Sequence, residues 1–284
     1  MPTSIMKSAV LGMLPRRRFW LFLGCRKIIC YYKAGRDAPP LPQSLIYDIL
    51  FLTNSEHPPT HTEKETVMQF ILLPFALCFL LYIHQENRYR FWAATALKVT
   101  LTLTLALCLL VALMRRYSPV LLAANLGMVL CAGGDYFLQY IRRSPGKFTC
   151  GILLFSLGHV CNLVALFLLD PFRPSALAVL AGLLALALAL KGIGRWDTSE
   201  NEPWLTIYIG LVAMTAAKSL SAAIAAPGAP GSLLLGLGGL LFFLSDIVLG
   251  IWNYQKNHIL VANLNWLLYF SGQFLLCAGY IAAA

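Results

Sequence analysis

Charged residues are scarce in this chain. They make up 12% of its 284 residues, whereas hydrophobic residues make up 59%. About a quarter of the residues in a soluble domain are charged, so the composition excludes a soluble globular protein. A membrane-spanning chain must form helices or a closed barrel, because lipid cannot hydrogen-bond to the backbone. The long, unbroken apolar runs favour helices.

Several motifs of common catalytic and nucleotide-binding sites are also missing. The sequence contains no G-x-x-x-x-G-K-[ST], H-E-x-x-H or G-x-S-x-G motif, and its eight cysteines form no C-x-x-C pair. We interpret the cysteines as small apolar residues within helices, and glycines such as Gly127 and Gly238 as close-packing positions. These motifs therefore give no indication of a metal or nucleotide site, and a metal or disulfide framework of the cysteines is the alternative interpretation.

The net charge of +10 at first suggests a nucleic-acid-binding protein. However, nine of the 22 basic residues precede residue 65, and most of the others flank apolar runs. This placement is typical of contacts with lipid headgroups and of topology signals. We therefore expect membrane lipid as a partner, and no nucleic acid.

The apolar runs predict an all-α bundle with about eight transmembrane helices. Short loops with proline and glycine separate the runs, which predicts one compact domain over residues 67–284. The expected spans are 67–83, 91–113, 119–140, 148–169, 175–192, 204–226, 231–252 and 259–283.

Residues 1–66 differ from the rest of the chain, because they are basic, contain several prolines and show no sustained periodicity. We expect this extension to be poorly ordered. Its 20–30 stretch is too short and too basic to span a bilayer, which leaves an interfacial segment or a poor signal sequence. Another interpretation places the native start at Met68, with the first 67 residues as a leader.

Basic residues concentrate in the loops after the first, third, fifth and seventh spans. The positive-inside rule then places these loops in the cytoplasm and both termini outside. The basic residues of these loops are Arg88, Arg90, Arg142, Arg143, Lys147, Lys191, Arg195 and Lys256, and those of the opposite loops are Arg115, Arg116 and Arg173.

Two aspartates, Asp135 and Asp246, lie within stretches that are otherwise apolar enough to span a bilayer. Since an ionised carboxylate is costly in hydrocarbon, an intramembrane acid indicates a functional site. Both lie near the C-terminal ends of their spans, on the predicted cytoplasmic side. Lys98 and Lys218 each precede one of them by one span, which is consistent with a 4+4 parallel repeat.

The other polar residues of the spans recur at helical spacing and are expected to converge on one wet interior. Alternatives remain: each Lys–Asp pair can be purely structural, His159 can be a hydrogen-bonded core residue, and Asn or Gln can join helices. This polar set includes His159, Asn162, Tyr208, Ser245, Tyr269 and Gln273.

Six short motifs, in order over about 68–283, resemble the YhhN family of eight-span membrane proteins, which includes the animal lysoplasmalogenases. They are Ala96-Leu97-Lys98, Gly134-Asp135, Gly158-His159, Tyr208 ten residues before Lys218, Leu244-Ser245-Asp246, and Tyr269-x-x-x-Gln273.

The resemblance implies a hydrolase that cleaves the vinyl-ether bond of lysoplasmalogens, giving a fatty aldehyde and a glycerophospho-base, without a cofactor. This chemistry needs one protonated acid and one group that stabilises positive charge or activates water, as in glycosidases. We therefore expect Asp135 and Asp246 to meet in one lipid-accessible cavity as paired acids. Either can be the proton donor, and His159 can relay a proton or orient water.

The remaining polar residues are candidates for binding the lysophospholipid substrate. Arg142 and Arg143 are alternative contacts for its phosphate. The substrate-binding candidates are Lys98, Lys218, Tyr208, Tyr269, Gln273, Asn162 and Ser245.

Two other functions compete with hydrolysis. Buried acids in a parallel repeat also suit a proton-coupled lipid or small-solute transporter, and a lipid-binding or scaffold protein would bind without turnover. The expected location is a bacterial inner membrane or the endoplasmic reticulum.

Overall fold

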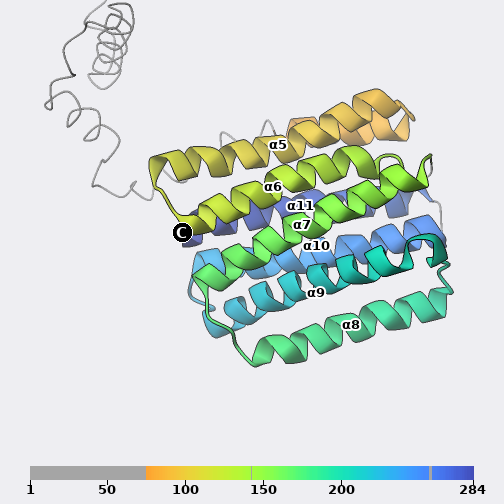
Figure 1. Cartoon of the computed structure of the whole chain (residues 1–284). Helices are drawn as coiled ribbons and strands as arrows, with labels where there is room; N and C mark the ends of the chain where they lie inside the picture. The colour runs from red at the N-terminus through yellow and green to blue at the C-terminus, as the bar shows by residue number, and fades with distance from the viewer. Residues whose placement is uncertain (1–74, 142, 256–257) are drawn as a thin grey trace, which may run out of the picture. The chain divides into compact units, whose positions relative to one another are not determined.

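A computed structural model describes residues 75–141, 143–255 and 258–284 (Figure 1). The predicted extension 1–66 lies outside the described residues, as do residues 67–74 at the start of the first predicted span. Arg142 and Lys256, two of the predicted cytoplasmic basic residues, lie outside them too. Within the described part of the chain, every regular element is a helix, which confirms the all-α prediction.

Residues 75–87 are helical and are the first described helical segment. Seven further helices in the described ranges are long and apolar enough to cross a bilayer. They are α5 (Phe91–Arg115), α6 (Pro119–Leu138), α7 (Pro145–Leu169), α8 (Ser175–Gly194), α9 (Glu202–Ala225), α10 (Pro230–Tyr254) and α11 (Ile259–Ala283), with the short 3-10 helix η2 (Ser199–Asn201) before α9.

Proline starts three of these helices. Pro119, Pro145 and Pro230 occupy the first helical position of α6, α7 and α10. Proline suits this position because its fixed φ is already helical and its missing N–H would have no partner inside the helix. Each of these prolines therefore marks the start of a helix.

Consecutive helices run antiparallel, so that the loops gather at two ends of the bundle (Figure 1). One end carries the described residues of the loops at 139–144, 195–201 and 255–258, and we call it the 139–144 end. The other carries the loops at 116–118, 170–174 and 226–229, and we call it the 170–174 end. Asp135 and Asp246 both lie in the last third of their helices, near the 139–144 end.

Glycine lets α10 and α11 approach at backbone distance. A Cβ on Gly238 would lie 2.7 Å from the backbone nitrogen of Leu276, and one on Gly272 would lie 2.8 Å from that of Phe242. Small residues at such crossings let membrane helices pack by van der Waals contact. The interpretation of Gly238 as a close-packing position is confirmed.

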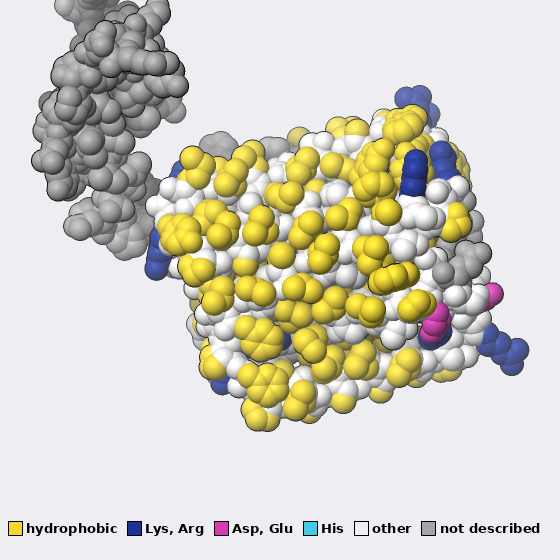
Figure 2. All heavy atoms as spheres, in the orientation of Figure 1, with side chains coloured by type: hydrophobic (Ala, Val, Ile, Leu, Met, Phe, Trp, Pro, Cys, Tyr) yellow, Lys and Arg dark blue, Asp and Glu magenta, His cyan; other side chains and the backbone are white. Residues whose placement is uncertain are grey.

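Helix α8 lies at the edge of the bundle, packed mainly on α9, and only Ala176 and Ala187 of its residues are buried. Hydrophobic side chains cover the face shown in Figure 2, and charged side chains gather toward the ends of the bundle. A surface that is apolar between two charged rims matches a bilayer. The chain is an integral, multi-pass membrane protein.

Candidate functional site

Asp135 sits on the buried face of α6 and is fully enclosed. Its carboxylate accepts a hydrogen bond of 2.5 Å from the Thr102 hydroxyl and bonds of 2.9 Å from the Tyr269 hydroxyl to both oxygens. The Lys98 ammonium forms an ion pair with it at 3.2 Å. Two hydroxyl donors and a cation thus surround this carboxylate, as the ionised form of a buried acid requires.

The partners of Asp135 lie on α5 and α11, where helical spacing places them on one face of each helix. Lys98 and Thr102 are four residues apart on one buried face of α5. Tyr269 and Gln273 have the same spacing on α11, where the Gln273 amide donates to the Tyr269 hydroxyl at 3.1 Å. The spacing that was visible in the sequence therefore does bring these side chains together.

Asp246 has a different setting. Its carboxylate accepts one hydrogen bond, of 2.7 Å, from the Tyr208 hydroxyl on α9. Among the described residues, no Lys or Arg forms an ion pair with it. Asp246 is only partly buried, and it lines a cavity of about 380 Å³.

The cavity lies between α8, α9 and α10 and extends toward the 139–144 end. Most of its lining is apolar, and Phe148 of α7 also contributes to it. The cavity is also lined by Leu184, Ala187 and Leu188 of the edge helix α8. Its volume falls within the range of small-molecule sites, about 300–1,000 Å³.

The expected common cavity for the two acids is not what the structure shows, because Asp135 is not among the residues that line this space. Aromatic rings connect the two sites instead. Phe155 lies 6.2 Å from both Tyr208 and Tyr269, measured between ring centroids. A layer of rings therefore separates an enclosed carboxylate from one that faces a cavity.

His159 belongs to this aromatic layer. It is fully buried, its ring lies 4.7 Å from that of Phe242, and its Nδ1 is 3.2 Å from the Thr215 hydroxyl. Among the described groups, its Nε2 has no hydrogen-bond partner. The His159 ring lies 6.0 Å from Tyr208, which places it beside the Asp246 site but not in contact with the carboxylate.

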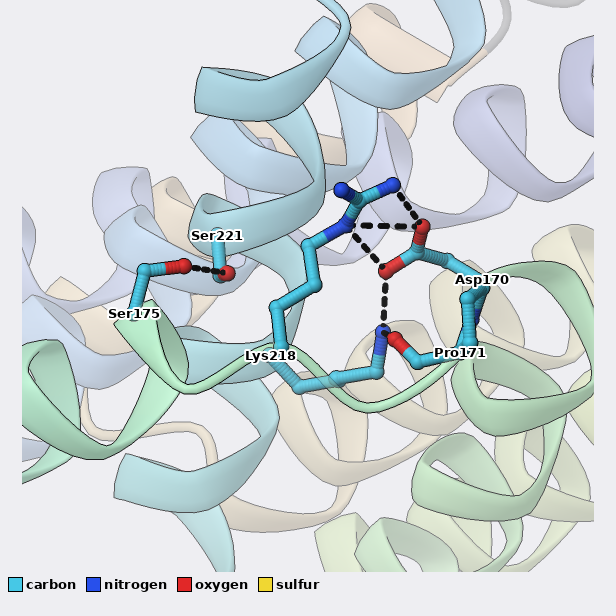
Figure 3. Close-up of polar contacts among 6 residues, drawn as sticks. Asp170, Pro171, Ser175, Lys218 and Ser221 are labelled. Carbon is cyan, nitrogen blue, oxygen red and sulfur yellow. Dashed lines mark hydrogen bonds and ion pairs between the residues drawn. The ribbon is translucent and has the colours of Figure 1, made fainter.

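Lys218 lies away from both acids and near the 170–174 end. Its ammonium donates to the Asp170 carboxylate at 2.5 Å and to the Pro171 carbonyl at 3.1 Å (Figure 3). Arg173 contacts the same carboxylate at 2.7 Å. Hydrogen bonds hold the pKa of the Asp170 carboxyl below its usual value. The bonds from Arg173 have the larger effect, and the bond from Lys218 has the smaller.

Lys218 therefore joins the α7–α8 loop to α9. It pairs with Asp170 and not with Asp246, so the alternative of a structural Lys218–Asp246 pair is not seen. The two lysines of the predicted repeat differ in depth, because Lys98 is near the start of α5 and Lys218 is in the second half of α9. The two aspartates match in depth, but the lysines do not.

Ser245 and Asn162, two further predicted substrate contacts, take part in contacts between and within helices. The Ser245 hydroxyl donates to the Phe242 carbonyl at 2.7 Å, and its own carbonyl accepts from Asn265 at 2.7 Å. The Asn162 carbonyl accepts from the Tyr280 hydroxyl at 3.2 Å. Roles for Ser245 and Asn162 in substrate binding remain predictions.

Sequence reasoning missed a polar wall of the cavity formed by Lys191, Trp196, Thr198 and Glu202. These residues look like ordinary ends of spans, and no spacing marks them as a group. Among the described residues, no three His, Cys, Asp or Glu side chains converge as metal ligands.

The fold and the site define a polytopic helical membrane protein with buried polar groups and a mostly apolar cavity. The YhhN family matches residues 93–280, about two thirds of the chain. No curated protein and no solved structure matches it. The chain belongs to the YhhN family, as the six motifs predicted.

Proposed function

We propose that this protein is a lysoplasmalogenase-like hydrolase, and that Asp246 is its proton donor. One observation carries the proposal: a carboxyl group lines an apolar cavity inside a membrane-spanning bundle, held by a single hydroxyl donor. Membership of the YhhN family is consistent with a membrane hydrolase of this kind. An apolar cavity suits the hydrocarbon chain, whose burial contributes about 0.8 kcal/mol per methylene.

The reaction is an acid-catalysed hydration. Asp246 protonates the vinyl carbon that is further from the ether oxygen, and the remaining carbon–oxygen unit becomes an oxocarbenium ion. Water adds to the carbon bonded to oxygen and gives its proton to the Asp246 carboxylate, which acts first as an acid and then as a base. The hemiacetal then breaks its carbon–oxygen bond, releasing the fatty aldehyde and the glycerol hydroxyl.

The two aspartates have different roles in this scheme. Asp135 is enclosed by donors and paired with Lys98, so it is the member of the pair that stays ionised. Its fixed negative charge, across the aromatic layer, favours the positive charge that develops on the substrate. Tyr208 positions the Asp246 carboxyl, and His159 is close enough to that site to orient water.

Membrane orientation follows from the basic residues. We propose that the 139–144 end faces the cytoplasm of a bacterial inner membrane or, in a eukaryote, of the endoplasmic reticulum. The described basic residues at that end are Arg88, Arg90, Arg143, Lys147, Lys191 and Arg195, and those of the opposite rim are Arg115, Arg116 and Arg173.

The function is tested by following fatty aldehyde release from lysoplasmenylcholine by the purified full-length protein in detergent. Turnover by the wild type is expected, with a loss of about 10²–10⁴-fold in Asp246→Asn. Asp197→Asn is the matched control, because Asp197 is an exposed acid at the same end of the bundle. Absence of aldehyde from the wild type, or full activity in Asp246→Asn, would contradict the proposal.

The matched depth of the two aspartates favours one competing function, a proton-coupled lipid or small-solute transporter. Measuring both lipid movement and aldehyde release with the protein in liposomes distinguishes a transporter from a hydrolase. Proton-dependent movement of lipid without aldehyde release would support the transporter and contradict the proposed hydrolase function.

A further inference from the structure

The polar wall of the cavity, near the 139–144 end, carries two charged residues, and we call this part of it the charged wall. Lys191 in the last turns of α8 and Glu202 at the first position of α9 both line the cavity and form an ion pair, and the Thr198 hydroxyl also donates to Glu202. A positive and a negative group are therefore presented side by side at the rim of an otherwise apolar space.

This ion pair is open to exchange with a ligand. The side chains of Lys191 and Glu202 are 32% and 46% exposed, whereas those of Lys218 and Asp170 are 2% and 16% exposed. Exposed pairs contribute only about 0–1 kcal/mol to stability, so a ligand that carries both charges can replace the internal contact at little cost. The buried pair at the opposite end has no such freedom.

The distance between the charged wall and the acid matches a lysophospholipid. Glu202 precedes Tyr208 by six residues on α9, a rise of about 9 Å at 1.5 Å per residue. Since Tyr208 holds Asp246, the charged wall lies about that far along the helix axis from the carboxyl group. In a lysoplasmalogen, roughly seven bonds separate the protonated vinyl carbon from phosphorus, about 9 Å when extended.

Aromatic rings complete the wall. Trp196 and Tyr254 both line the cavity, and their rings stack with centroids 5.9 Å apart and an angle of 22° between the planes. Gly250 makes room for the indole, because a Cβ there would lie 2.4 Å from the Trp196 ring. Aromatic faces attract ammonium groups, so this wall adds to the attraction that Glu202 exerts on a cation.

We propose that Lys191, Glu202 and Trp196 form a headgroup subsite that selects a zwitterionic phosphate–ammonium headgroup. Lys191 binds the phosphate, and Glu202 with Trp196 binds the ammonium group. A headgroup that ends in phosphate alone leaves Glu202 facing a second negative charge, and this repulsion sets the specificity. The inference rests on the proposed function, because it places the same lipid in the same cavity.

Binding of two lipids that cannot be hydrolysed tests the subsite. Both have an alkyl ether in place of the vinyl ether; one carries phosphocholine and the other a phosphate monoester. Dissociation constants are measured for the full-length protein in nanodiscs by native mass spectrometry. The wild type is expected to bind the phosphocholine lipid at least about tenfold more tightly, since hydrogen bonds to charged groups are among the stronger ones.

Two substitutions separate the two contacts. Glu202→Gln keeps the shape of the side chain and should reduce the preference to about twofold, whereas Lys191→Met should weaken binding of both lipids about tenfold. Arg88→Gln removes an exposed charge at the same end and away from the cavity, and is expected to change neither constant. An unchanged preference in Glu202→Gln overturns the inference.

Glu202→Asp provides a second test that does not depend on the folding of Glu202→Gln. It retains the charge but shortens its reach, so a lower preference is expected, and an unchanged one overturns the inference equally. Binding does not require hydrolysis, which separates the two proposals. Selective binding without aldehyde release removes the proposed function alone, and aldehyde release without headgroup selection removes the subsite alone.

Discussion

Asp135 and Asp246 lie at similar depths in α6 and α10, yet their surroundings differ in almost every respect. Asp135 is fully enclosed and contacts Thr102, Tyr269 and Lys98, whereas Asp246 has one donor, Tyr208, and faces a cavity. A carboxylate that is held by several donors and a cation is suited to a permanent charge. A carboxyl group with one donor and access to a cavity is suited to proton exchange.

The largest expected difference between the two aspartates is in the loss of protein stability when each is replaced by asparagine. Asp135→Asn leaves the buried Lys98 ammonium without its counter-charge, and we expect a loss of about 3–5 kcal/mol. Asp246→Asn should cost less than about 1 kcal/mol, because its amide oxygen can still accept from Tyr208. Thermal unfolding of the purified variants measures both.

Lys98→Met combined with Asp135→Asn provides the control. This double variant removes the stranded charge and should recover most of the stability that Asp135→Asn loses. Equal losses in Asp135→Asn and Asp246→Asn would contradict the assigned difference between the two sites.

The 170–174 end offers a third carboxylate for the comparison. Asp170→Asn strands the buried ammonium of Lys218, and we expect a loss of about 3 kcal/mol at neutral pH. The folded-state pKa of Asp170 lies below its unfolded value. Its contribution is therefore present above the unfolded pKa, near pH 4, and is lost as the pH falls through the folded pKa.

Unfolding measured between pH 7 and pH 3 tests this linkage. The difference in stability between the wild type and Asp170→Asn should shrink toward the acid end of the range. A difference that stays constant over this range would show that the charge of Asp170 does not stabilise the α7–α8 loop.

The two tyrosines allow a finer test. Tyr208→Phe removes the only described donor to Asp246, and we expect kcat to fall about tenfold with little change in KM. Tyr269→Phe leaves Asp135 with Thr102 and Lys98, so its expected effect on kcat is about threefold. Steady-state kinetics of aldehyde release compares them, and a larger effect in Tyr269→Phe would reverse the assignment.

Much of the fold could be predicted from the sequence, because the features that set it are local. Pro119, Pro145 and Pro230 mark helix starts, and seven apolar runs in the described part of the chain have the length that a bilayer requires. Asp135 and Asp246 stand out for the same reason, since a carboxylate in an apolar run demands partners. The i, i+4 spacing of Tyr269 and Gln273 also correctly indicated one polar face.

The partners of these groups could not be predicted, because they depend on how the helices pack. Tyr269 reaches Asp135 across 134 positions of the chain. Lys218 lies within an apolar span, yet pairs with Asp170 in a loop, a contact that its side-chain length permits and no spacing reveals. The cavity lies beside α8, which packs mainly on α9 and buries only two of its residues, and no pattern in the sequence marks this loose packing.

Hydrolysis of lysoplasmenylcholine in heavy water, with mass spectrometry of the aldehyde, tests most directly whether Asp246 transfers the proton. The wild type should release aldehyde with one deuterium on the carbon next to the carbonyl, and Asp246→Asn should form it at least about 100-fold more slowly. Labelled aldehyde formed by Asp246→Asn at the wild-type rate would contradict the account.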